Sequence, residues 1–198
     1  MRVLWFTNTP ANADEYFQSE LKGTGGWLKA LDQALQEYVE LHIAFYKDYK
    51  EPFKHKGSHY YPIKPCKSFF GKILGLFGHN AIINDDDLGK YIEIINHVKP
   101  DIIHIHGTEN PFTCLIPHTK IPVVVSIQGN LTVYLHKYFS GMERKYLKVS
   151  LRDYTNFKSC LFPQRFAGSY RAFRKMQKRE YKSIGFVKNF IGRTDWDR

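Results

Sequence analysis

Short runs of apolar residues alternate along the chain with longer segments in which apolar residues recur every three or four positions. The short runs predict strands over residues 2–7, 39–46, 58–63, 102–105, 122–127 and 187–191. The periodic segments predict helices over residues 25–38, 84–99 and much of 141–185, with a short helix near 112–116. Strands that alternate with helices and are apolar along nearly their whole length are typical of a parallel sheet covered on both faces. We therefore predict an α/β fold: a doubly wound, Rossmann-like parallel sheet with helices on both faces.

The first predicted helix separates apolar from polar positions. Its apolar face comprises Trp27, Leu28, Leu31, Ala34, Leu35 and Tyr38. Its polar face comprises Asp32, Gln33, Gln36 and Glu37. We expect the apolar face to pack on the sheet and the polar face to meet solvent.

Residues 100–107, Pro-Asp-Ile-Ile-His-Ile-His-Gly, join a helix end to a buried strand and a polar strand exit. Pro100 ends the preceding helix, and the isoleucines form the apolar part of the strand. The strand ends in His106 and Gly107. Because ligands of open α/β sheets bind outside the carboxyl ends of the strands, His106 is a candidate ligand contact. A purely structural hydrogen bond by this histidine is the alternative.

A second predicted strand ends in the same manner, since Val-Val-Val-Ser-Ile is followed by Gln128, Gly129 and Asn130. Parallel strands end at one edge of a sheet, so we expect both exits on one rim. Gly25 and Gly26 come directly before the first helix. Glycine lets a ligand approach the backbone closely, and the unpaired amides of a helix start favour an anion such as a phosphate.

Short motifs that are typical of nucleotide-binding proteins, metalloproteases and serine hydrolases are absent from the sequence. The patterns GxGxxG, GxxxxGK[ST], HExxH and GxSxG do not occur. We expect the side chains of His104 and His106 to point to opposite faces of their strand, so that they would not bind one metal ion together. Cys66, Cys114 and Cys160 form neither a CxxC pair nor an even disulfide set, which favours a reducing compartment. No metal site is predicted.

Charge adds a regional feature to this picture. The chain of 198 residues, long enough for one domain, has a net charge of +10. Residues 137–188 contain 14 lysines and arginines against three acidic residues, so the excess is concentrated there. A basic region of this kind can face nucleic acid, anionic lipid or phosphorylated ligands.

The apolar runs also bear on location. None reaches 18 residues, and the N-terminus lacks a signal-peptide pattern, so we expect a cytoplasmic protein without a membrane-spanning helix. Residues 64–84 combine apolar residues with glycines and predict a loop or short helix over the core. The alternative is contact with a membrane interface through Phe69, Phe70, Leu74 and Phe77.

Four segments follow one another along the chain: Gly-Gly-Trp-Leu at 25–28, residues 100–107, Val-Val-Val-Ser-Ile-Gln-Gly-Asn at 123–130, and Phe-Ile-Gly-Arg-Thr-Asp-Trp-Asp at 190–197. Together they resemble the amino-terminal half of a retaining glycosyltransferase of family 4, which has the GT-B fold. The resemblance implies that residues 1–198 form a single Rossmann-like, acceptor-side domain. It also implies that the carboxy-terminal, donor-binding domain is absent from this chain, and we therefore expect the isolated domain to be inactive.

The resemblance further implies roles for individual residues. Gly25 and Gly26 match the glycine-rich loop that approaches the donor, and Gln128 stands where the family commonly has an active-site histidine. Glutamine positions a sugar hydroxyl but cannot act as a general base. With Gln128, His106 is the second candidate catalytic residue. The candidate acceptor contacts are Glu109, Asn110, Asn130 and Arg193.

These observations lead to one functional hypothesis and one alternative. The resemblance implies transfer of a sugar, with retention, from a nucleotide-sugar donor to a polysaccharide or glycolipid precursor, with no metal ion or other cofactor. We also expect the basic helices to dock on the inner face of an anionic membrane. The alternative is a non-catalytic α/β binding module that uses residues 137–188 for nucleic acid or anionic ligands. Against nucleic acid, the aromatic residues of that region fall at helical core spacing and no RNA-binding motif occurs.

Overall fold

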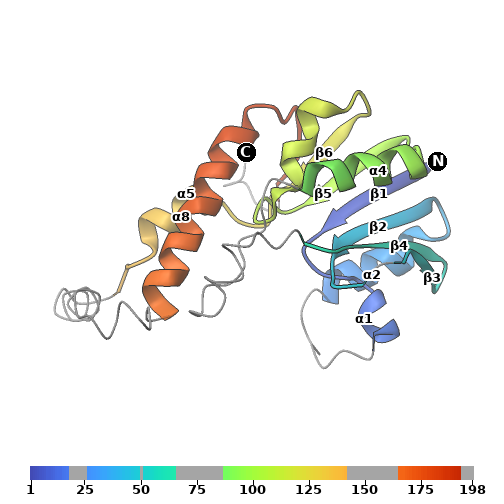
Figure 1. The fold of residues 1–198 in the computed structure, drawn as a ribbon, viewed down its shortest axis with the longest axis horizontal. Coiled ribbons are helices and arrows are strands. Elements are labelled where there is room, and N and C mark those ends of the chain that lie inside the picture. Colours follow the sequence, from blue (N-terminus) through green and yellow to red (C-terminus); the bar gives the residue numbers. More distant parts are fainter. Residues whose placement is uncertain (18–25, 50, 66–86, 142–164, 193–198) are drawn as a thin grey trace.

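The computed structural model describes residues 1–17, 26–49, 51–65, 87–141 and 165–192 (Figure 1). Its strands are β1 (Arg2–Thr7), β2 (Glu40–Tyr46), β3 (Phe53–His55), β4 (Ser58–Ile63), β5 (Ile102–His106), β6 (Val123–Ser126) and β7 (Asn189–Ile191). Its helices are α1 (Ala13–Tyr16), α2 (Gly26–Leu35), α4 (Leu88–Val98), the 3-10 helix η2 (Pro111–His118), α5 (Leu131–Lys137) and α8 (Arg165–Ile184).

The described strands form one sheet in the order β3-β4-β2-β1-β5-β6-β7. All neighbouring strands are parallel except β3 and β4. The chain winds outward from β1 through β2 and β4 on one side, and through β5, β6 and β7 on the other. This is the doubly wound, Rossmann-like α/β fold that the sequence predicts, with helices on both faces of the sheet (Figure 1).

The central strand β1 shows why the sheet needs cover on both faces. Val3 and Trp5 belong to the core cluster that includes Leu28 of α2. Leu4 and Phe6 belong to the opposite cluster, which includes side chains of α4 and η2. Because every side chain of β1 after Arg2 is buried, its apolar residues from Val3 to Phe6 follow one another without alternation.

The segment 100–107 has the organisation predicted for it. The left-handed backbone of Lys99 (φ 49°) ends α4, and Pro100 follows directly. Ile103 and Ile105 of β5 are fully buried in the cluster beneath α4. The strand then ends at His106, and Gly107 begins the exit.

Three short elements, α1, β3 and α5, are absent from the sequence-based prediction. The seven residues of α5 directly follow the polar exit of β6. The four residues of α1 lie in the polar connection after β1 and are too few to show a helical period. The three residues of β3 pair antiparallel with β4 through Lys56 and Gly57, whose φ angles of 45° and 88° are typical of a type I′ hairpin turn. The edge of the sheet is therefore antiparallel, an addition common in doubly wound folds.

Helix α8 contains 20 residues and lies beside α5, beyond the end of the sheet toward which the strand arrows point (Figure 1). Tyr138, directly after α5, contacts Tyr170 and Phe173 of α8, with ring centroids 5.2 and 5.6 Å apart. Arg174, Lys175, Lys178 and Lys182 are exposed. None of the described helices is long and apolar enough to cross a membrane.

The expected division of α2 into two faces is wrong at three positions. Asp32, assigned to the solvent face, is fully buried, whereas Trp27 and Tyr38, assigned to the core face, are 42% and 77% exposed. The helix ends at Leu35, so Tyr38 lies beyond its last turn.

Hydrogen bonds to its carboxylate explain the burial of Asp32. Its Oδ2 accepts from Asn12 Nδ2 at 2.7 Å and from the Tyr60 hydroxyl at 2.6 Å. Its Oδ1 accepts from Ser58 Oγ at 2.6 Å and from Gln36 Nε2 at 3.0 Å. A buried carboxylate needs this number of donors to offset the loss of hydration. Asp32 thus ties α2 to β4 and to the segment after β1.

We predict that Asp32→Ala lowers the free energy of unfolding by about 3–5 kcal/mol, because it leaves the buried donors of Asn12, Ser58 and Tyr60 without their acceptor. Urea denaturation followed by circular dichroism measures the change. The matched control is Gln33→Ala, which alters an exposed residue of the same helix. Equal stability of the two variants would contradict the role given to Asp32.

Candidate functional site

The candidate site lies at the carboxyl edge of the sheet, where β1, β5 and β6 end next to one another. In the sheet register, His106 is paired with Thr7 on one side and with Ser126 on the other. The chain leaves β1 toward α2 on one face and leaves β5 toward η2 on the opposite face. Ligands of doubly wound sheets bind where neighbouring connections diverge in this way. We call Asn8, residues 106–110 and residues 128–130 the rim.

A polar cluster links the exits of β1 and β5. Asn8 Nδ2 donates to Glu109 Oε2 at 2.7 Å, and Asn110 Nδ2 donates to Asn8 Oδ1 at 2.7 Å. All three side chains are half-buried. The structure thus brings together two predicted acceptor contacts, Glu109 and Asn110, around a residue that the sequence analysis missed. Asn8 carries the signal that identified His106 and Gln128, namely a polar residue directly after a buried strand.

Gly107 allows this cluster to form. Its φ of +89° is a backbone conformation that favours glycine. A Cβ at this position would lie 2.1 Å from Glu109 Oε2 and 2.7 Å from Asn8 Nδ2. The hydrogen bond between Asn8 and Glu109 therefore passes directly over Gly107.

His106 is a fully buried residue of the rim. Its ring lies edge-on to Trp5, with ring centroids 4.7 Å apart, and 5.5 Å from the ring of Trp27. Trp27 is 42% exposed, so among these three rings its indole is the one that meets solvent. The catalytic role of His106 stays a prediction, and Trp27 joins the residues beside the site.

His104 and His106 lie on the same face of β5, with ring centroids 3.9 Å apart. The expectation of opposite faces was wrong, because side chains alternate along a strand with a period of two and residues i and i+2 share a face. His104 Nε2 lies 2.7 Å from Ser126 Oγ, and burial lowers the pKa of His104 to about 4. His104 is therefore neutral at neutral pH. The part of the chain that the structure describes contains no group of three or more potential metal ligands.

The exit of β6 forms the second half of the rim. Gln128 is half-buried, and its Nε2, although buried, has no hydrogen-bond acceptor among the described residues. Asn130 caps α5, since its side-chain oxygen accepts from Val133 N at 3.1 Å. The Asn130 oxygen that a ligand could use is thus engaged in the helix cap, and contact of Asn130 with an acceptor stays a prediction.

The remaining predicted residues differ in what the structure says of them. Gly26 is the first residue of α2, and a Cβ added to it would have no atom of the described residues within 4 Å. The described residues therefore leave its backbone uncovered on that side. The predicted residues that lie outside the described ones are Gly25, Arg193, Phe69, Phe70, Leu74 and Phe77.

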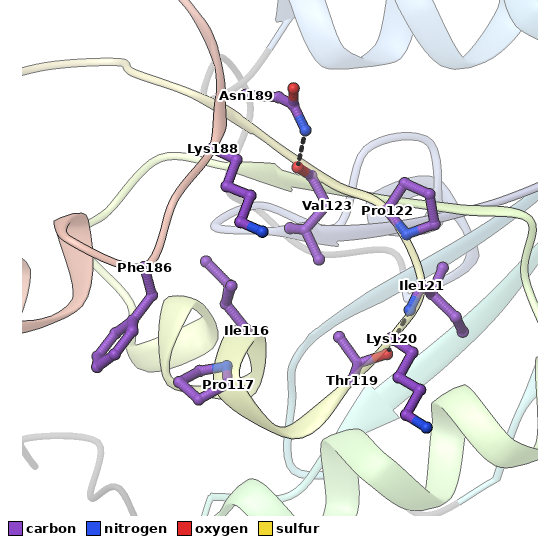
Figure 2. A pocket seen from close by; sticks show the side chains of 10 residues that line it. All are labelled: Ile116, Pro117, Thr119, Lys120, Ile121, Pro122, Val123, Phe186, Lys188 and Asn189. Atoms are coloured by element: carbon purple, nitrogen blue, oxygen red, sulfur yellow. Dashed lines mark hydrogen bonds between the residues drawn. The ribbon is translucent and has the colours of Figure 1, made fainter.

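A pocket of about 490 Å³ lies away from the rim, beside the amino ends of β6 and β7 (Figure 2). Ile116, Pro117, Val123 and Phe186 give it a largely apolar wall, and the side chain of Lys188 points into it. No predicted site residue lines this pocket. Its position at the amino ends of the strands is opposite to the edge at which doubly wound sheets bind their ligands.

No family model and no curated protein sequence matches the chain. Among solved structures, the chain is similar to the sucrose-phosphate synthase from Thermosynechococcus elongatus, with a TM-score of 0.43 and 7% sequence identity. The match covers 79% of this chain and 40% of that protein, so the chain spans less than half of its length.

We predict that Gly107→Ala lowers the free energy of unfolding by about 2–3 kcal/mol, because it adds backbone strain and displaces the Glu109 carboxylate. Urea denaturation measures the loss. Gly141→Ala is the matched control, since Gly141 also has a positive φ (81°) but no atom near its added Cβ. A loss as small as that of the control would show that the contact with Glu109 does not matter.

We also predict a pH dependence of stability from His104. Its pKa is about 4 in the folded protein and about 6.5 when unfolded, so the unfolded chain binds more protons between these values. The free energy of unfolding should therefore fall by up to about 3 kcal/mol as the pH is lowered from 7 to 4. His104→Gln, which keeps a polar partner for Ser126, should reduce this slope. The exposed His118, substituted by Gln, is the control, and an unchanged slope in His104→Gln would refute the prediction.

Proposed function

We propose that the chain is the acceptor-side domain of a glycosyltransferase that moves a sugar from a nucleotide-sugar donor to a polysaccharide or glycolipid precursor. The observation that carries this proposal is the cluster of Asn8, Glu109 and Asn110 at the switch point of a Rossmann-like sheet. The four sequence segments that resemble a family 4 glycosyltransferase support it, since residues 100–107 and 123–130 lead to this edge.

The chemistry of the cluster suits a carbohydrate. A sugar hydroxyl both donates and accepts hydrogen bonds, and adjacent hydroxyls present several such groups side by side. The Glu109 carboxylate can accept from one hydroxyl while the Asn110 amide offers an acceptor or a donor to the next. In this proposal Asn8 does not itself bind the sugar. It orients Glu109 through the 2.7 Å hydrogen bond.

The donor side of the proposal uses the other loops. The backbone at Gly25 and Gly26 would approach the donor phosphates at the start of α2. Gln128 would position the transferred sugar, with His106 beneath it, and Asn130 and Arg193 would complete the acceptor side. We propose retention of anomeric configuration without a metal ion. Because the resemblance assigns the donor to a second domain, the activity belongs to the complete two-domain enzyme.

A second candidate function uses the outer side of α8. Arg174, Lys175, Lys178 and Lys182 are exposed along this helix. Such a surface favours anionic partners, and we propose peripheral docking at the cytoplasmic face of an anionic membrane, aided by Phe69, Phe70, Leu74 and Phe77. In a binding module without catalysis, the same surface would be the functional one.

We predict that Glu109→Gln and Asn8→Ala lower kcat/KM for the acceptor about 10- to 100-fold in the full-length protein that carries this chain, because both weaken a charge-assisted contact. Release of nucleotide from a panel of nucleotide sugars, with lipid-linked oligosaccharides as acceptors, measures the rate. The control is Glu93→Gln, which alters an exposed carboxylate of α4. Normal turnover by both rim variants would refute the site assignment.

Gly26→Ala provides a second arm of this experiment. The added methyl group meets no atom of the described residues, so the variant should be as stable as the parent protein. A raised KM for the donor at unchanged stability would place the donor above Gly26. An unchanged KM would remove the first turn of α2 from the donor site.

A further inference from the structure

Helix α8 reaches the exit of β5 through two neighbouring side chains. The Arg179 guanidinium donates from Nη2 to the backbone oxygen of Glu109. The Glu180 carboxylate accepts from the Thr108 hydroxyl. Two consecutive residues of α8 thus bind two consecutive residues of the rim, and one of these, Glu109, belongs to the polar cluster.

The same turn of α8 also holds the start of α5, which directly follows the exit of β6. Gln177, one turn before Glu180 on α8, donates from Nε2 to Thr132 Oγ1 at 3.2 Å. The backbone amides of Leu131 and Thr132 lie close enough to the Glu180 carboxylate to lower its pKa. Glu180 therefore lies between the exit of β5 and the first turn of α5, which directly follows residues 128–130.

Burial makes this carboxylate costly for the fold. Glu180 is 4% exposed, and burial raises its pKa, while the hydrogen bond from Thr108 and the amides of Thr132 and Leu131 lower it. An apolar side chain at this position of the helix would stabilise the packing as well or better. A requirement for one acceptor that serves donors from two loops accounts for a carboxylate here.

The sheet itself does not fix the separation of the two exits. Among the described residues, the last backbone hydrogen bond between them runs from Gly107 N to Ser126 O at 2.9 Å. Beyond it the chain turns toward η2 on one side and α5 on the other, and α8 supplies the connection.

We infer that Glu180 is a positioning residue that holds residues 106–110 and 128–130 at a fixed separation, so that one ligand contacts both. That the ligand is an acceptor sugar rests on the proposed function. The mechanical part of the inference, a carboxylate that couples two loops, stands on the contacts alone.

The test compares Glu180→Met and Thr108→Val with Glu93→Met in the full-length protein. Methionine has nearly the shape of glutamate but no acceptor oxygen, so it removes the contacts with both loops. Amide hydrogen exchange then reports each segment separately. In Glu180→Met we expect exchange to accelerate about tenfold or more in both 107–110 and 131–134, with β1 unchanged. Thr108→Val should accelerate exchange in 107–110 alone.

Two results would overturn the inference: acceleration confined to one loop in Glu180→Met, or equal acceleration throughout the sheet, which denotes a general loss of stability. Transfer kinetics form the second arm. Loosened positioning should lower kcat about tenfold in Glu180→Met with little change in the KM of the donor, and an unchanged kcat would also overturn the positioning role. If the parent protein transfers no sugar, the proposed function fails, while the exchange data still decide whether Glu180 couples the loops.

Discussion

The structure depends above all on the burial of β1. This strand has a parallel neighbour on each edge and a layer of helices on each face, so its apolar side chains, from Val3 to Phe6, lie alternately in one of two cores. Each large apolar side chain buried in this way contributes about 1.5–3 kcal/mol, which makes the centre of the sheet the most strongly held part of the fold. Parallel pairing then brings the ends of β1, β5 and β6 to the same edge. The candidate site is a geometric consequence of this arrangement, because polar residues that follow these strands meet there.

A polar rim on an apolar sheet has to be held by other polar groups, and two buried carboxylates do this. Asp32 binds α2, which starts beside the rim, to β4 and to the connection after β1. Glu180 binds the exit of β5 and the start of α5 to α8. Each carboxylate accepts from donors of at least two other elements, so each joins segments distant in the sequence. The loops that carry the candidate residues therefore owe their positions to hydrogen bonds made one layer below the rim.

Much of the fold could be predicted from the sequence because burial on both faces of the sheet leaves a continuous apolar run in strands such as β1, a pattern visible without a structure. The short elements α1, β3 and α5 were not predicted, since three to seven residues show little or no period. Asp32 was placed in solvent because a helical wheel records polarity, not the partners that make a buried carboxylate tolerable. Candidate residues after β5 and β6 were found from their positions at strand ends. Glu180 was missed because its role arises from contacts with residues 72 positions away, at Thr108.

Helix α8 connects the two surfaces to which a function is proposed, the rim and the basic outer side of the helix itself. Its inner side holds the rim through Arg179 and Glu180, while its outer side presents Arg174, Lys178 and Lys182 to solvent. Both sides belong to one 20-residue helix. An anionic partner on the outer side would therefore bind the same helix that holds the rim. The basic surface of α8 is therefore compatible with a ligand site at the rim. In the proposed transferase both the rim and the basic surface bind a partner, whereas in a binding module without catalysis only the basic surface does.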